Sequence, residues 1–407
     1  MSDTDMPKKP GIVQFLGLKR NLVGLLTMVV LVGMGERMAE RFLPIYLMAI
    51  GGGAISIGLL NGLDNLLSAL YAYPGGFLSD RLGTKRALIV FNLIAIFGFA
   101  VVVAVPDWRA VIFGALFFIS WSAISLPATM SLINRVLPKN KRTMGVSMHS
   151  LVRRVPMALG PLLGGAFISA WGERMGIRYA FIVAIAMALA AMALQQILIE
   201  PDPPRKNREA EAPRGSMFSL MTPRLRSLLV SDILIRFCEQ IPYAFVVIWC
   251  MKSISDPVGP MQFGVLTVIE MATAILVYIP VAALADRGEK KPFVIATFVF
   301  FTAFPIVLYF SRSFWWLVPA FVVRGLKEFG EPARKALIMD LAPEDRKAAM
   351  FGFYYLLRDM IVSVAAFGGA FLWMRSPELN LFVASAFGAA GTIWFAVYGR
   401  DVSKAEE

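Results

Sequence analysis

Long apolar stretches recur along the chain and are separated by short polar connections. Twelve of them are long enough to cross a hydrocarbon core of about 30 Å as helices, which takes about 20 residues each. One polar, proline-rich connection is longer than the others and divides the stretches into six and six. The predicted spans are 22–49, 55–79, 86–105, 110–136, 144–171, 178–199, 227–252, 260–285, 292–310, 315–340, 348–373 and 380–399.

Lysine and arginine cluster in alternate connections, which sets the predicted topology. The positive-inside rule places the richer connections, both termini and the long linker in the cytoplasm. The short loops suit a bacterial inner membrane. The predicted organisation is a cytoplasmic tail (1–21), a six-helix bundle (22–199), a cytoplasmic linker (200–226), a second six-helix bundle (227–399) and a cytoplasmic tail (400–407).

Composition supports the membrane interpretation. Hydrophobic residues make up 57% of the 407 positions and charged residues 17%, whereas a soluble domain carries about 25% charged residues. The net charge of +12 lies in short loops and forms no stripe or arm, so we expect contacts with lipid headgroups and not with nucleic acid. Cys238 and Cys250 fall in one span without metal-ligand spacing and are interpreted as core residues.

The two halves repeat each other at an offset of roughly 204 residues. Residues 142–167 align with 346–371, and the segment Gly-Gly-Ala-Phe at 164–167 recurs at 368–371. Arg154 then aligns with Arg358. The repeat predicts an all-α transmembrane fold of two parallel six-helix bundles around a central cavity, with the substrate site between them near the midplane.

Charged residues inside a membrane are costly and mark a polar path, a partner or a functional site. The third, sixth, ninth and twelfth predicted spans carry almost none, so we expect these four to face lipid. The other spans supply Glu36, Arg37, Glu40, Arg41, Asp64, Arg153, Arg154, Asp232, Arg236, Glu239, Glu270, Arg324, Lys327, Glu328, Arg358 and Asp359.

The loop after the second predicted span reads GFLSDRLGTKR and fits the pattern G-x-x-x-D-R-x-G-x-[RK]-[RK]. This sequence resembles the loop motif of the major facilitator superfamily, and the resemblance implies the twelve-helix fold and a latch on the cytoplasmic side. A tight basic turn that only sets topology is the alternative. The copy in the second half has Ala282 in place of the glycine and is one residue short. The predicted latch residues are Gly76, Asp80, Arg81, Gly83, Lys85 and Arg86, with Asp286 and Arg287 in the copy.

The fifth span holds Gly160, Pro161, Gly164 and Gly165, which resemble the later part of the motif of drug/proton antiporters in that family. The glycine usual at the start of the motif is Pro156 here. Small residues allow close helix packing, and plain packing is the alternative role. The resemblance favours efflux. The arginine that such antiporters carry in the fourth helix is absent, whereas its counterpart in the repeat is the basic Arg324.

Proton coupling needs carboxyl groups whose protonation changes with their surroundings. Burial favours the protonated form and a nearby arginine favours the ionised form, so paired carboxylates are candidates; a structural ion pair is the alternative for each. His149, the only histidine, has a proton role or a packing role. The predicted coupling residues are Glu36, Glu40, Glu239 and Glu328, and the predicted substrate-binding residues are Arg236, Arg324, Lys327, Arg358, Trp121, Tyr243 and Tyr355.

Three functions fit these observations. The first is proton-coupled efflux of a small anionic or amphipathic organic solute by alternating access, the second is proton-linked uptake of an organic acid, and the third is a receptor or lipid-interaction protein without transport. Nucleotide-binding loops, metal-ligand clusters and nucleophile motifs are absent from the sequence, so we expect no enzyme and no cofactor. The expected partners are a small-molecule substrate, protons or another ion, and membrane lipids, and we expect a monomer.

Overall fold

The computed structural model describes residues 20–119, 121, 125, 129, 132, 142–200, 218–285, 289–343 and 347–400. All the described elements are helical. The first half contains α2 (Arg20–Glu40), α3 (Leu43–Ala49), α4 (Ala54–Leu82), α5 (Thr84–Ala104), α6 (Trp108–Phe118) and α8 (Arg142–Leu198). The second half contains α9 (Pro223–Tyr243), α10 (Val246–Ile248), the π-helical turn η2 (Trp249–Ser253), α11 (Pro260–Ala285), α12 (Lys291–Phe310), α13 (Phe314–Leu326), α14 (Glu331–Leu341), α15 (Lys347–Arg375) and α16 (Pro377–Tyr398).

Helix α8 contains two membrane spans, because the chain reverses at Gly172. This residue has φ 75° and ψ 172°, a conformation that favours glycine. Gly176 then lies so close to the preceding span that a Cβ there would sit 2.5 Å from the Phe167 carbonyl oxygen. The fifth and sixth predicted spans therefore form a tight hairpin.

In the part of the chain that the structure describes, three spans are broken. The first is interrupted between α2 and α3, the seventh bends by 43° between α9 and the segment Val246–Ser253, and the tenth is interrupted between α13 and α14. Phe42 and Phe245 are the N-cap residues that directly precede the second segments of the first and seventh spans, and they occupy equivalent places in the repeat. Broken spans expose backbone polar groups, which membrane proteins tolerate only where protein or a cavity surrounds them.

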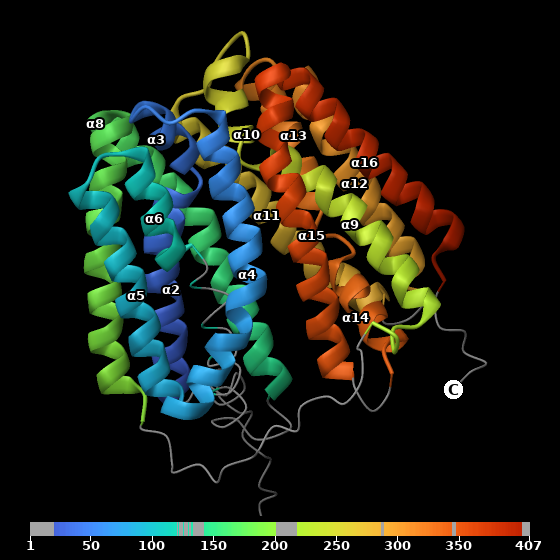
Figure 1. Ribbon diagram of the computed structural model, residues 1–407, viewed down its shortest axis with the longest axis horizontal. Helices are drawn as coiled ribbons and strands as arrows, with labels where there is room; N and C mark the ends of the chain where they lie inside the picture. Colours follow the sequence, from blue (N-terminus) through green and yellow to red (C-terminus); the bar gives the residue numbers. More distant parts are fainter. Residues whose placement is uncertain are drawn as a thin grey trace, which may run out of the picture.

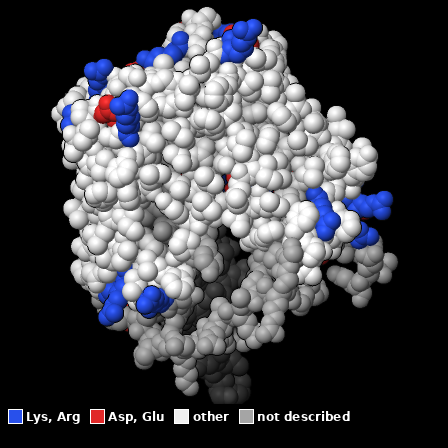
Figure 2. Space-filling model, viewed as in Figure 1, with Lys and Arg blue, Asp and Glu red and all other residues white. Residues whose placement is uncertain are grey.

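The helices form two bundles that meet at one end and part at the other (Figure 1). At the meeting end, called the closed end below, α4 packs against α15 and α8 against α11. A Cβ on Gly58 would lie 2.5 Å from that of Ala370, and one on Gly165 would lie 2.5 Å from the Pro260 carbonyl oxygen. The opposite end, where α8 stops and α9 begins, is called the linker end, and the two bundles part toward it (Figure 1). Figure 2 shows the surface of the molecule in the same view.

The outer surface is that of a membrane protein. Lysine and arginine lie near the two ends, and a broad belt between them is almost free of charge (Figure 2). Large apolar side chains such as Leu276 of α11 and Val364 of α15 are exposed. Among the described residues, six helices are long and apolar enough to span a bilayer, and α9 with its continuation makes a seventh. The twelve-span helical fold is therefore that of an integral, multi-pass membrane protein.

Candidate functional site

The breaks in the first and seventh spans meet at a pocket between the two halves, called the central pocket below. It encloses about 490 Å³, part of which is open to solvent. Arg41 lies at the first break, and Tyr243 and Ala244 lie at the second. The residues that line it are Glu40, Arg41, Leu43, Pro44, Leu60, Asn61, Asp64, Ile119, Tyr243, Ala244, Val246, Val247, Phe263 and Arg324.

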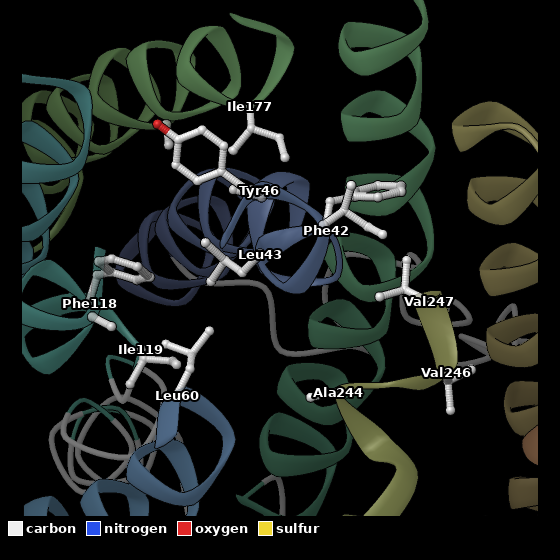
Figure 3. Close-up of a cluster of buried hydrophobic side chains, with 14 of the residues drawn as sticks. Phe42, Leu43, Tyr46, Leu60, Phe118, Ile119, Ile177, Ala244, Val246 and Val247 are labelled. Atoms are coloured by element: carbon white, nitrogen blue, oxygen red, sulfur yellow. The ribbon is translucent and has the colours of Figure 1, made fainter. Parts of the chain in front are cut away.

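Two apolar walls face each other across the central pocket. Leu43, Leu60 and Ile119 come from the first half, and Val246 and Val247 face them from the second half (Figure 3). All five side chains belong to one buried cluster that joins the halves. A hydrophobic body held between these walls would lose contact with water, which is favourable in proportion to its apolar area.

The acidic side of the pocket is formed by Glu40 and Asp64. Glu40 lies 2.5 Å from the Arg37 guanidinium, one helical turn earlier in α2. Asp64 lies within electrostatic range of Glu36, Arg37 and Glu40. Arg37 therefore pairs with Glu40 and lies within electrostatic range of Asp64, and adding a proton to either acidic group would change the balance of charge.

The basic side is formed by Arg41 from α2's end and Arg324 from α13. The two guanidinium groups lie 5.3 Å and 5.8 Å from the centre of the Tyr243 ring. Both also approach the carboxylate of Glu270, at 3.8 Å and 3.3 Å. Sequence reasoning found Arg324 and Tyr243, and it placed Arg41 and Glu270 inside spans without assigning them to the site.

A smaller pocket of about 230 Å³ adjoins the central pocket and shares Tyr243, Val246 and Arg324 with it. Glu239 accepts hydrogen bonds here from Arg236, at 2.6 Å, and from Lys327, at 2.7 Å. The Lys327 ammonium also lies 5.0 Å from the centre of the Phe301 ring. The structure therefore brings three of the predicted residues together as one ion triad beside the central pocket.

Glu36 and Trp121 lie in a third pocket, inside the first half. It encloses about 390 Å³ and is also lined by Arg37 and Arg153. The Trp121 indole donates a hydrogen bond of 2.9 Å to the Asn92 side chain. Arg37 therefore lines this pocket while it pairs with Glu40 at the central pocket.

Arg358 and Tyr355 lie away from these pockets, in a buried ion cluster of the second half. Arg358 contacts Asp232 at 3.3 Å and lies 4.2 Å from the centre of the Tyr355 ring. Arg334 pairs with both Asp232 and Glu331. Sequence reasoning missed Arg334 and Glu331, although their spacing of three residues on one helix face is typical of an ion pair.

Glu328 forms an ion pair across the two halves. Its carboxylate accepts a hydrogen bond of 3.0 Å from Arg154 of α8. The Glu328 side chain is 37% exposed, so solvent reaches this pair more easily than the ion triad. The pair has to break whenever α8 and the turn after α13 separate.

The predicted latch is described in part. Gly83, with φ 82°, joins α4 to α5 in a conformation that favours glycine. Lys85 donates a hydrogen bond of 2.9 Å to the Gln196 carbonyl of its own half. Gly76 and Asp80 lie in α4, and the Asp80 side chain is outside the described part. The side chain of His149 and the whole of Asp286 and Arg287 are also outside it. Arg81 and Arg86 are exposed.

The predicted packing motif lies between α8 and two neighbours. A Cβ on Gly160 would meet the Arg37 side chain at 2.6 Å, and one on Gly164 would meet the Met38 carbonyl oxygen at 1.9 Å. Gly165 faces α11 across the halves, next to Pro260, and Pro161 follows Gly160 along the helix. In the described part, no three histidine, cysteine or acidic side chains form a metal site.

A helical membrane protein whose broken spans meet at a charged pocket between two bundles has the architecture of a secondary transporter. The model of the Major Facilitator Superfamily matches residues 25–255 and 228–407. The chain belongs to this superfamily.

Curated relatives cover most of the chain. It is 24% identical to the multidrug resistance protein MdtG of Escherichia fergusonii over 84% of this chain and 85% of that one. It is 26% identical to the inner membrane transport protein YajR of Escherichia coli, over 94% and 83%. An uncharacterized MFS-type transporter of Methanocaldococcus jannaschii is 22% identical over 86% and 88%.

Solved structures share the fold at low identity. A peptide transporter POT in complex with sulfate has a TM-score of 0.75 at 14% identity, covering 97% of this chain and 95% of that one. A bacterial homolog to the human lysosomal transporter Spinster has a TM-score of 0.69 at 13% identity, covering 97% and 100%. These similarities show the fold.

Proposed function

We propose that the protein exports a small amphipathic or anionic organic solute in exchange for protons, by alternating access. The observation that carries this proposal is the central pocket, where apolar walls from both halves lie beside Glu40 and Asp64. A solute in this pocket contacts both halves at once, so its binding energy differs between the open and closed arrangements. The printed name of MdtG, a multidrug resistance protein, supports the outward direction.

Coupling follows from the shared charge balance around the pocket. Adding a proton to Glu40 or Asp64 releases Arg37 from one of its acidic neighbours. Glu36 and Glu239 also lie within electrostatic range of basic side chains. Glu328 forms an ion pair with Arg154 of the other half. A bound solute and a bound proton then change the same set of ion pairs, which gives a coupling free energy between them.

We propose that the linker end faces the cytoplasm of a bacterial inner membrane. The positive-inside distribution supports this orientation, and under it the two bundles part toward the cytoplasm (Figure 1). An impermeant thiol reagent should label Arg109→Cys, which is exposed beyond the closed end, in intact cells, and should label Arg400→Cys only after lysis. The reverse result would invert the topology.

Proton movement in proteoliposomes tests the coupling. A solute added outside enters down its gradient, so exchange with protons makes the lumen more alkaline and cotransport makes it more acidic, whichever way the protein is inserted. We expect alkalinisation that Glu40→Gln and Asp64→Asn reduce at least tenfold, with protein-free vesicles giving the background. Asp340→Asn, at an exposed ion pair, is the matched control. No protein-dependent pH change with any solute would refute proton coupling.

A second candidate is proton-linked uptake of an organic acid. It is favoured by the two guanidinium groups of Arg41 and Arg324, which face the central pocket from opposite halves. An anion binds more firmly when a nearby carboxylate takes up a proton, because the repulsion between the two negative charges is removed. The anion and the proton would therefore be transported together. Protein-dependent acidification of the lumen in the same assay would select this candidate over efflux.

A further inference from the structure

Two arginines of the central pocket share a single carboxylate. Arg41 from the first half and Arg324 from the second lie 3.8 Å and 3.3 Å from one oxygen of Glu270. Arg324 and Glu270 are only 3% and 4% exposed. A buried guanidinium normally obtains several hydrogen bonds from its partner carboxylate, often in a two-pronged arrangement. Neither arginine has that arrangement here.

Two polar atoms of the Arg324–Glu270 pair lack a hydrogen-bond partner. Within the described part of the chain, the Nε of Arg324 and the Oε2 of Glu270 are buried without a hydrogen-bond partner. A buried polar atom without a hydrogen-bond partner is energetically costly. Because Arg324 lines the central pocket, an anionic group entering the pocket is able to supply the missing acceptor.

The charges of Arg41, Arg324 and Glu270 indicate how many negative charges the anionic group of the ligand carries. Two guanidinium groups and one carboxylate leave one positive charge at the tyrosine ring. This count covers the arginine pair and Glu270 alone. The acidic residues that line the pocket are Glu40, which pairs with Arg37 at 2.5 Å, and Asp64, which lies within electrostatic range of the same arginine. One negative charge from a ligand therefore neutralises the arginine pair, whereas a doubly charged group would leave an excess buried negative charge, which is costly.

The surroundings indicate the rest of the ligand. The apolar walls begin at Leu43 beside Arg41 and at Val246 beside Tyr243, and Figure 3 shows both walls lining the space between the halves. The centre of the Tyr243 ring lies 5.3 Å and 5.8 Å from the two guanidinium groups. An anionic head at the arginines therefore places an attached hydrophobic body against the walls.

We propose that Arg41 and Arg324 together bind the carboxylate group of a hydrophobic organic monoanion, and that Glu270 occupies this position when the ligand is absent. The proposal rests on the transport function proposed above and names its substrate class. It holds for either direction of proton coupling, because it concerns binding alone. Glu270 then acts as an internal competitor of the ligand and its removal strengthens binding.

Equilibrium binding to the purified full-length protein tests the proposal without a proton gradient. The probes are 4-phenylbutyrate, its amide and 4-phenylbutylamine, which share one hydrophobic body and differ in the head group. We expect binding of the carboxylate and at least tenfold weaker binding of the other two. Arg41→Gln and Arg324→Gln should each weaken carboxylate binding at least tenfold, while Arg109→Gln, an exposed arginine outside the pocket, should leave it unchanged.

Glu270→Gln separates a binding role from a structural one. The variant removes the competing charge and keeps the side chain's size, so carboxylate binding should tighten at least threefold. Unchanged or weaker binding to Glu270→Gln, or preference for the amine, would overturn the proposal. If the arginine variants do not remain monodisperse, Glu270→Gln decides alone. Carboxylate binding without proton movement would refute only the coupling, and proton-coupled transport without carboxylate binding would refute only this site.

Discussion

Gly164 and Gly368 are partners in the sequence repeat and have opposite surroundings. A Cβ on Gly164 would lie 1.9 Å from the Met38 carbonyl oxygen, whereas one on Gly368 would meet nothing within 4 Å. Overpacking costs about 1–3 kcal/mol, or more against backbone, while alanine favours a helix over glycine by about 1 kcal/mol. We expect Gly164→Ala to lower the melting temperature in detergent and Gly368→Ala to leave it unchanged or raise it. Equal effects would contradict the described contact between α8 and α2.

Asp232 is the anionic centre of the buried cluster in the second half. It is 1% exposed and pairs with Arg334 and Arg358. Removing one partner of a buried pair costs about 3–5 kcal/mol, so Asp232→Asn should strongly destabilise the protein. Asp340→Asn, at an exposed pair with Lys290, should cost no more than about 1 kcal/mol. Denaturation of both variants in the same detergent compares them, and similar losses would argue against the cluster.

The break in the seventh span is the element that couples the two halves. The amide groups of both Ala244 and Phe245 donate to the Pro242 carbonyl, which leaves the carbonyls of Gln240 and Ile241 without their helical donors. Asn61 of α4, in the first half, donates to Gln240 at 3.0 Å. Asn380 of the second half donates to Ile241 at 3.2 Å. The geometry of the break therefore depends on contact between the halves.

We expect Asn61→Ala to shift the protein away from the described arrangement. An unsatisfied carbonyl costs about 1–3 kcal/mol, which corresponds to a factor of about 5 to 150 in the conformational equilibrium. Spin labels at Met48 and Met261, exposed positions on α3 and α11, should report a larger population of long distances. Asn380→Ala should lower stability without changing the distances, because its partners all lie in the second half.

Movement of the two bundles as rigid bodies predicts that a covalent bond at the closed end stops transport. A Cβ on Gly62 would lie 3.1 Å from that of Phe367 in the other half, near the separation of about 3.8 Å that a disulfide needs. The double variant Gly62→Cys, Phe367→Cys should lose solute transport on oxidation and regain it on reduction. Each single variant serves as the control, and transport by the oxidised protein would refute rocking.

The sequence alone determined the class of fold, because apolar length and periodic charge follow directly from the thickness and low polarity of a bilayer. Twelve spans, two repeats and an interior of charged residues could all be deduced without coordinates. The prediction treated the first, seventh and tenth spans as continuous, however, since no signal stronger than an internal proline such as Pro242 marks a break. The neighbouring helices that satisfy the broken backbone are distant in sequence.

The site was also only partly predictable, because the helices that form it are distant from one another in the sequence. Glu40, Arg324 and Tyr243 could be selected because each is polar or aromatic within a span, yet Arg358 has the same signature and lies in an ion cluster away from the central pocket. Which charges neutralise one another depends on distances such as 3.3 Å and 3.8 Å between helices that are distant in the sequence. The sequence determined that the charges lie inside the membrane, and only the tertiary packing decided that Arg41, Arg324 and Glu270 would face one another.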